Sequence, residues 1–228
     1  PRVRREKPRV GAFTSADVPK ILALTPDLVL TFSDLQADIA ADLIRKGVQV
    51  HAFNQRDIEG IFGMIRTVGA LTGCSARAAK LVDAYAMRVA RVAAHTRPHR
   101  PRVWFEEWDE PLISGIPWVS ELIEVAGGQD VFADLSHGPG ARERIVTPEA
   151  AAAAMPEVIL ASWCGKKVVP ERIAGRPGWD RVPAVRDGRI HEIKSPLILS
   201  PGPAALTAGL DALVEALWGG QAALGAVA

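Results

Sequence analysis

The amino-acid sequence predicts an α/β protein with two lobes, each built on a parallel sheet, joined by one long helix. Short apolar runs bounded by turn residues recur in both halves of the chain, and a helical pattern follows most of them. A third observation is a continuous helical pattern over residues 57–96, which separates the two halves. With 228 residues, of which 48% are hydrophobic, the chain can bury a substantial core.

The first lobe is predicted from the order strand, helix, strand. Residues 10–12 form a short strand, after which Ser15 is expected to cap a short helix. Residues 27–32 (DLVLTF) form an apolar run between polar residues, which is typical of a parallel strand that is buried on both faces. The next helix ends at Gly47, and residues 48–53 form the following strand. This order predicts a βαβ unit.

The connecting segment carries apolar side chains at helical spacing almost throughout residues 57–96. The sequence TGCS marks a break or kink near Gly73, although the whole segment is longer than most globular helices. Residues 97–102 (RPHRPR) are rich in proline and cations and are interpreted as a boundary. The predicted parts are an N-terminal lobe over 1–56, a connecting helix over 57–97 and a C-terminal lobe over 98–228.

The second lobe repeats the alternation of strands and helices. Strands are predicted at 103–105, 130–132, 157–162 and 188–193. Helices are predicted at 117–128, 147–156, 168–175 and 202–217. Thr147 is expected to cap the second of these helices, with Pro148 at its first position.

Composition and motifs exclude several classes of function. The 27 basic and 26 acidic residues leave a net charge of +1, which gives no footprint for nucleic acid. No apolar run is long enough to span a membrane, and no signal peptide is visible. Cys74 and Cys164 lie far apart without metal-ligand spacing, so free thiols are the simplest reading and a disulfide has no support.

Catalytic interpretations find little support. The histidines show no metal-ligand spacing, and the chain lacks a nucleophile elbow or a phosphate-binding loop. Glu106 and Glu110 could act as an acid and a base, but a long helix between two lobes fits the hydrolase plans poorly. We therefore expect no enzyme activity, no catalytic residue, no metal site and no intrinsic cofactor.

Polar and aromatic side chains follow four predicted strands, where parallel sheets bind ligands. The candidate ligand-binding residues are Phe32, Ser33, Asp34, Glu106, Glu107, Trp108, Asp109, Trp163, Cys164, Ser195, Pro196 and Leu197. In the segment FEEWDEP, four carboxylates surround Trp108 with no cation among them. A lone Trp after a strand more often packs in a core, and acidic loops are usually only solvated. Because all four strand ends would contribute such side chains to one cleft, the pattern favours a binding site. In this site Trp108 would offer a flat face to a large planar ligand.

Four motifs carry a resemblance to a known family. They are ILALTPDLVLTF, PLISGIPWVSELIEVAGGQDVF, IVTPEAAAAAMPEVILAS and SPGPAALTAGLDAL. The chain resembles the helical-backbone (class III) substrate-binding proteins of bacterial ABC importers, which serve vitamin B12, ferric siderophores and haem. The likeness is closest to the cobalamin-binding branch and covers residues 10–217.

The resemblance implies two Rossmann-like lobes that capture a corrinoid in the cleft between them and deliver it to an importer permease. It implies a periplasmic or extracytoplasmic location, with a lipid anchor as one option. A ferric siderophore is an alternative ligand, but such ligands are often anionic and the cleft is acid-rich. Haem is another, but no His or Tyr follows a strand to serve as an axial ligand. A truncated intracellular corrinoid carrier or enzyme is the third alternative.

Two departures from the family pattern lead to further expectations. The chain lacks the βα segment that precedes the first strand in the family, so the first lobe is expected to be truncated at its N-terminus. Its uncovered sheet edge should pair with an upstream segment or with a second copy in a homodimer. Asp38 lies near the expected permease-docking position of the first lobe, whereas residues 194–204 of the second lobe contain no acid.

Overall fold

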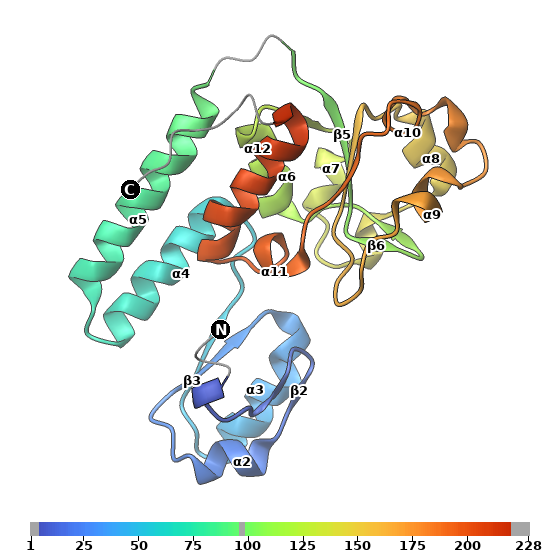
Figure 1. Cartoon of the computed structure of the whole chain (residues 1–228). Helices are drawn as coiled ribbons and strands as arrows, with labels where there is room; N and C mark the ends of the chain where they lie inside the picture. Colours follow the sequence, from blue (N-terminus) through green and yellow to red (C-terminus); the bar gives the residue numbers. More distant parts are fainter. Residues whose placement is uncertain (1–4, 96–98, 220–228) are drawn as a thin grey trace. The chain divides into compact units, whose positions relative to one another are not determined.

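The computed structural model describes residues 5–95 and 99–219 (Figure 1). The chain divides into two compact units, residues 1–55 and residues 56–228. The predicted α/β class with parallel sheets is confirmed in both. Residues 96–98, where the sequence predicts the end of the connecting helix, lie outside the described residues. In the described ranges, no helix combines the length and the apolar character needed to cross a bilayer.

The first unit contains the predicted βαβ order. Its elements are β1 (Gly11–Ala12), β2 (Ser15–Ala16), α2 (Val18–Ala23), β3 (Val29–Phe32), the short 3-10 helix η1 (Asp34–Gln36), α3 (Ala37–Arg45) and β4 (Val50–Phe53). Strands β1 and β2 form an antiparallel hairpin. Strands β3 and β4 are parallel, with Val29 opposite Val50, and α3 connects them.

Two predictions about the first unit are wrong. Ser15 lies in β2, and Asp17 caps α2 instead, because its carboxylate accepts a hydrogen bond from the Lys20 backbone N–H at 3.1 Å. Strand β3 is not buried on both faces, since Leu30 is 46% exposed while its neighbour Thr31 is buried. Successive side chains of a strand point to opposite faces, so only one face of this sheet is covered.

The connecting segment is a pair of helices and not one long helix. Helices α4 (Ile58–Leu71) and α5 (Ser75–Ala93) lie side by side, joined by a tight turn (Figure 1). Gly73 makes this turn with a φ of 69°, a value that favours glycine. The break that the sequence marks near Gly73 is therefore a full reversal, which lets each helix bury its apolar face. Both helices contribute to the core of the second unit, through Ile65 and Val82 among others.

The second unit is built on a four-stranded sheet in the order β11–β10–β5–β8, with all neighbours parallel. These strands are β5 (Arg102–Glu106), β8 (Gln129–Asp130), β10 (Val158–Ala161) and β11 (Ile190–Glu192). A small antiparallel sheet contains β6 (Trp108–Asp109), β7 (Leu112–Ile113) and β9 (Ile145–Val146). Besides α4 and α5, this unit contains the helices α6 (Pro117–Val125), α7 (Ala133–Ser136), α8 (Pro148–Ala153), α9 (Pro170–Ala174), α10 (Pro183–Arg186), α11 (Ser195–Ile198) and α12 (Leu210–Trp218). It also contains the 3-10 turns η2 (Arg142–Arg144) and η3 (Trp179–Arg181) and the π-helical turn η4 (Ala205–Gly209). Thr147 caps α8 as predicted.

The two faces of this sheet support two separate cores. Val103 and Phe105 of β5 pack in the core that includes α4, α5, α6 and α12. Trp104, which lies between them, faces the opposite core with Ile159 of β10 and Trp179. This alternation explains why β5 and β10 read as continuous apolar runs in the sequence, because strands covered on both faces need apolar residues at every position.

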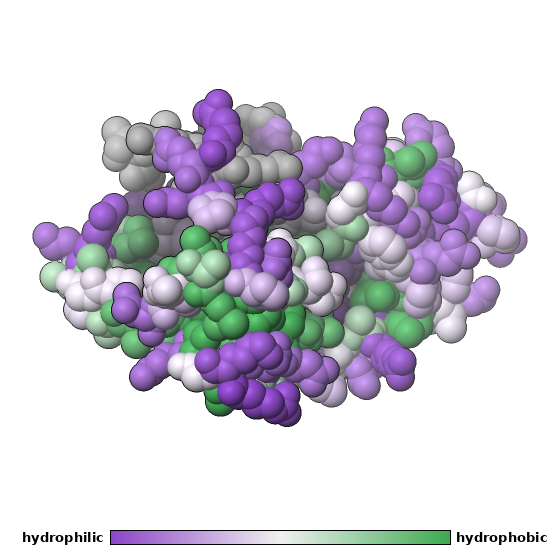
Figure 2. All heavy atoms as spheres, turned by 90° about the horizontal axis from the view of Figure 1, so that it is seen from below, coloured by the Kyte–Doolittle hydropathy of each residue, from purple (hydrophilic) through white to green (hydrophobic). Residues whose placement is uncertain are grey.

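The surface is mainly polar, but an apolar area interrupts it in the view of Figure 2. The first unit exposes several large apolar side chains for its small size. They are Phe13, Leu24, Leu30, Leu35 and Ile44.

Candidate functional site

The carboxyl ends of three strands lie at one edge of the large sheet in the second unit. Glu106 ends β5, Ala161 ends β10 and Glu192 ends β11, and the register places these three residues opposite one another. The segments that follow these strands therefore start at the same edge. Three of the four predicted groups of ligand-binding residues lie on these segments, and the fourth, Phe32 to Asp34, follows β3 in the first unit.

Glu106 is a buried ion-pair residue. Its side chain is 0% exposed, and Arg176 donates to its two oxygens at 2.6 and 2.8 Å. The indole N–H groups of Trp104 and Trp163 donate to the same carboxylate at 3.1 and 3.0 Å. Its oxygens already accept four hydrogen bonds inside the protein, so the predicted ligand contact of Glu106, which stays a prediction, would require one of these bonds to be exchanged.

Two other acids of this segment, Glu107 and Asp109, also have cationic partners. Arg144 of η2 donates to both oxygens of Glu107, at 2.7 and 3.2 Å. Lys166 pairs with Asp109 Oδ1, and Arg172 of α9 lies 3.5 Å from Asp109 Oδ2. The partners lie far away in the sequence. The sequence-based argument that an acid-rich site disfavours anionic ligands is therefore wrong, since these charges are compensated.

Trp108 is half-buried in β6, at the edge of the small sheet. Its indole N–H donates to the Glu110 carbonyl oxygen at 3.0 Å, which fixes the orientation of the ring. The Lys166 ammonium lies 4.1 Å from the centroid of this ring. Trp108 is thus accessible in part, and a cation occupies one of its faces in the described structure.

Trp163 does not provide an exposed aromatic surface. It is 2% exposed and packs in the core with Trp104 and Trp179, which leaves little of its ring for the predicted ligand contact. The next residue, Cys164, is exposed and carries a free thiol, as does Cys74. Trp163 therefore serves the core, as a lone Trp after a strand more often does.

The remaining candidates differ in accessibility. In α11, Ser195 and Leu197 are half-buried and Pro196 is exposed. The accessibility of these three residues is compatible with the predicted ligand contacts, which stay predictions.

In the first unit, Phe32 is half-buried and Asp34 is exposed. Ser33 is buried and has a φ of 65°, and its hydroxyl oxygen accepts a hydrogen bond from the Leu35 N–H at 3.3 Å. Asp38 is exposed in the first turn of α3. Ser33 therefore helps to form the turn after β3, which leaves Phe32 and Asp34 as the more accessible candidates there.

Four basic residues at this edge of the second unit were missed by sequence reasoning. They are Arg144, Lys166, Arg172 and Arg176. The only available signal is that acids as dense as those of FEEWDEP require counter-charges in a folded protein. Which cations supply them depends on the tertiary fold.

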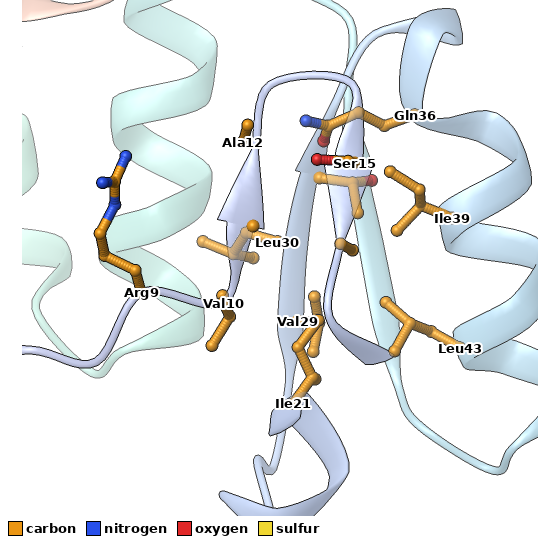
Figure 3. Close-up of a pocket in the computed structure, with 13 residues that line it drawn as sticks. Arg9, Val10, Ala12, Ser15, Ile21, Val29, Leu30, Gln36, Ile39 and Leu43 are labelled. Carbon is orange, nitrogen blue, oxygen red and sulfur yellow. The ribbon is translucent and has the colours of Figure 1, made fainter. Parts of the chain in front are cut away.

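A cavity of about 240 Å³ lies in the first unit beside β3 (Figure 3). Its walls come from the β1–β2 hairpin, β3 and α3, and most of the lining side chains are apolar, such as Leu30 and Ile39. The Gln36 side chain joins two of these walls, because its amide group donates to the Phe13 carbonyl at 2.7 Å and accepts from the Phe32 N–H at 2.9 Å. The Thr31 hydroxyl is buried and has no hydrogen-bond partner among the described residues.

Residues 1–197 match the family described as "Periplasmic binding protein". The chain belongs to this family. The resemblance inferred from the four sequence motifs is thereby confirmed. Members of this family act outside the cytoplasm as the substrate-binding components of ABC transport systems.

Among known relatives, a cobalamin-binding protein of Halobacterium salinarum is 30% identical over 130 residues. The aligned region is 55% of this chain and 35% of that relative, so the chain spans about a third of the relative's length. Among solved structures, the periplasmic heme-binding protein BhuT in complex with two hemes is 25% identical, with a TM-score of 0.77 over 95% of this chain and 85% of that one. The periplasmic vitamin B12 binding protein BtuF of Vibrio cholerae is 21% identical, with a TM-score of 0.71 over 94% and 83%. The last likeness shows the fold alone.

Proposed function

We propose that this periplasmic binding protein captures a corrinoid, such as cobalamin, and delivers it to the permease of an ABC importer. The observation that carries the proposal is Trp108, a half-buried indole that follows the carboxyl end of β5. Local identity to a cobalamin-binding protein supports the choice of ligand. The chain binds and releases its ligand without catalysing a reaction.

The chemistry around Trp108 suits a large ring with amide substituents. An indole offers apolar area and a preferred stacking face to a planar macrocycle. Asp109 Oδ2 is buried and accepts no hydrogen bond among the described residues, and Glu110 is exposed nearby in sequence. Carboxylate oxygens accept hydrogen bonds from amide N–H groups, which the periphery of a corrinoid carries.

Calorimetric titration of the protein with cyanocobalamin tests the proposal. We expect saturable 1:1 binding, accompanied by quenching of tryptophan fluorescence. Haem and a ferric hydroxamate, titrated under the same conditions, serve as competing ligands. Saturable binding of either of these with no cobalamin binding would contradict the corrinoid proposal but retain the family function.

An anionic ligand, such as a ferric siderophore, is the second candidate. The observation that favours it is the compensation of the acids by Arg144, Lys166, Arg172 and Arg176, which removes the electrostatic argument against negative ligands. Lys167 is exposed on the segment after β10 and adds positive charge there. Arg and Lys are the side chains that hold carboxylate and phosphate groups in proteins.

We also propose that Asp38 contacts a basic residue of the permease. It is exposed near the start of α3, where a carboxylate is available for an intermolecular ion pair. Charge reversal, Asp38→Lys, should lower ligand uptake in a reconstituted importer without changing ligand affinity. Asp42, one helical turn later, pairs with Lys46 on the same helix, so Asp42→Asn is the matched control.

A further inference from the structure

A single lysine occupies the aromatic face that the proposed function assigns to the ligand. The Lys166 ammonium lies 4.1 Å from the Trp108 ring centroid and 5.1 Å from the Trp163 centroid. Gly165, with a φ of 76°, turns the chain immediately before it. An ammonium at these distances is attracted to the face of an indole ring.

The same ammonium compensates a buried carboxylate. The Asp109 side chain is 3% exposed, and Lys166 pairs with its Oδ1 atom. Its Oδ2 atom has only the longer contact to Arg172 at 3.5 Å and accepts no hydrogen bond among the described residues. Removing Lys166 without a replacement would leave a desolvated negative charge that only the exposed Arg172 guanidinium compensates.

Lys166 can leave its carboxylate more easily than Arg176 and Arg144 can leave theirs. Its side chain is 37% exposed, whereas the side chains of Arg176 and Arg144 are 13% and 4% exposed. Arg176 and Arg144 also hold their carboxylates through two hydrogen bonds each. Lys166 therefore combines contact with Trp108, partial solvent exposure and a single carboxylate bond.

We propose that Lys166 is a displaceable cap on Trp108 and a specificity-determining residue. A ligand that stacks on Trp108 replaces the ammonium on the ring and must also supply a hydrogen-bond donor to Asp109. The site thus selects planar ligands that carry amide or cationic groups at their periphery and rejects those that carry only carboxylates there. This inference rests on the proposed function, in which the ligand stacks on Trp108.

The cap can be tested without any ligand, by acrylamide quenching of tryptophan fluorescence. The contribution of Trp108 is obtained by subtracting the signal of the same protein with Trp108→Phe. Lys166→Ala should raise the quenching constant of this contribution, and the double variant Lys166→Ala/Asp109→Asn should do the same without a buried unpaired charge. Lys167→Ala removes the adjacent exposed lysine and should leave the quenching constant of the Trp108 contribution unchanged. Equal quenching in all of these proteins would overturn the cap.

Specificity is tested by titration with cyanocobalamin and with haem. Lys166→Ala should bind cyanocobalamin about two- to fivefold more tightly, the factor that corresponds to an exposed cation–π contact. Asp109→Asn should weaken that binding, because an amide oxygen is a poorer acceptor than a carboxylate. Weaker cobalamin binding by Lys166→Ala, or haem binding that depends on Lys166, would show that the lysine holds the ligand and would overturn the proposal. If no variant binds cobalamin, the proposed function fails, and the quenching comparison still decides whether Lys166 caps Trp108.

Discussion

Arg176 holds Glu106 through two parallel hydrogen bonds, Nη1 to Oε2 at 2.6 Å and Nη2 to Oε1 at 2.8 Å, in the interior of the second unit. The Arg176 guanidinium also lies 4.7 Å from the ring centroid of Trp179. The pair joins the end of β5 to the segment after α9, so it fixes two of the chain segments from which the candidate site is built.

Replacement of Arg176 by methionine should destabilise the protein by about 3–5 kcal/mol, the usual cost of leaving one partner of a buried ion pair uncompensated. The free energy of unfolding in urea measures the effect. Glu106→Gln/Arg176→Met should recover part of the loss, because a neutral amide can still accept from the indole N–H groups of Trp104 and Trp163.

The exposed ion pair between Arg66 and Glu59 on α4 provides the control, with side chains that are 52% and 75% exposed. Arg66→Met should leave the unfolding midpoint nearly unchanged, since exposed pairs contribute little. Equal effects of Arg66→Met and Arg176→Met would show that the Glu106–Arg176 pair has no structural role.

The strand ends of the second unit could be predicted from sequence, but the charge pairing around them could not. Residues 103–105 and 158–161 are apolar at every position, and such runs indicate parallel strands whose ends form a common edge. The partner of Glu106 lies seventy positions further along the chain, and that of Glu107 thirty-seven. Local spacing carries no information about contacts at this separation, so the cluster looked uncompensated.

Trp108→Ala should weaken binding of cobalamin by about 2 kcal/mol, the scale of an aromatic anchor at an interface. Trp108→Phe should retain most of the affinity, because it keeps a stacking face and loses only the hydrogen bond to the Glu110 carbonyl. Calorimetry on the three proteins measures the difference. Unchanged affinity in Trp108→Ala would exclude Trp108 from the ligand site.

Two glycines of α4 should respond in opposite ways to substitution by alanine. A Cβ atom on Gly69 would lie 2.3 Å from the Ala78 Cβ of α5, so Gly69→Ala must push the two helices apart at a cost of about 1–3 kcal/mol. Gly63 has no atom within 4 Å of such a position, and Gly63→Ala should stabilise the helix by up to about 1 kcal/mol.

Thermal and urea unfolding of the two glycine variants measure these effects. Destabilisation by both would indicate that α4 requires glycine for another reason than its approach to α5. The sequence predicted the apolar faces of this segment and the break at Gly73. It did not predict that the chain reverses there, because a kink and a reversal have the same local signal.

Asp130→Asn should stabilise the protein at neutral pH. Burial raises the pKa of Asp130 above its usual value, and the carboxylate of Glu124 acts in the same direction, while hydrogen bonds from the Phe132 N–H and the Ser120 hydroxyl oppose them in part. The folded state therefore binds the proton more tightly than the unfolded chain, and the ionised carboxylate costs stability above the raised pKa.

The stabilising effect of Asp130→Asn should vary with pH in a defined direction. Below the unfolded-state pKa of about 3.9, both states are protonated and the variant gains little. As the pH rises from the unfolded-state pKa to the raised pKa of the folded state, the stabilisation by Asp130→Asn should grow, and above the raised pKa it should stay constant. Urea unfolding at about pH 4 and about pH 7 tests this, and a gain that is larger at the lower pH would contradict the assignment.

In the first unit, β3 pairs with β4 on one side and has no partner strand on the other among the described residues. In a parallel pair, alternate residues bond to one neighbour, and the N–H groups of Val29 and Ser33 donate to β4. The backbone groups of Leu30 and Phe32 therefore face the other edge, at which, in the described part of the chain, no strand pairs and only the Phe32 N–H is capped, by the Gln36 side chain. The cavity of about 240 Å³ and the half-exposed Leu30 side chain lie at this edge. An unpaired strand next to apolar surface is prone to pair with another chain.

We expect this 228-residue chain to form a homodimer through β3, with a molar mass by light scattering that rises towards twice the 24.4 kDa of one copy as concentration increases. Leu30→Lys should shift the equilibrium to monomer, because a charged side chain at an open edge opposes pairing. Ile44→Lys is the matched control, since Ile44 is another large, exposed apolar residue of the same unit and does not line the cavity. Circular dichroism on both variants checks that the fold is retained. A monomer at all concentrations, or equal dissociation by both variants, would show that the β3 edge does not mediate association.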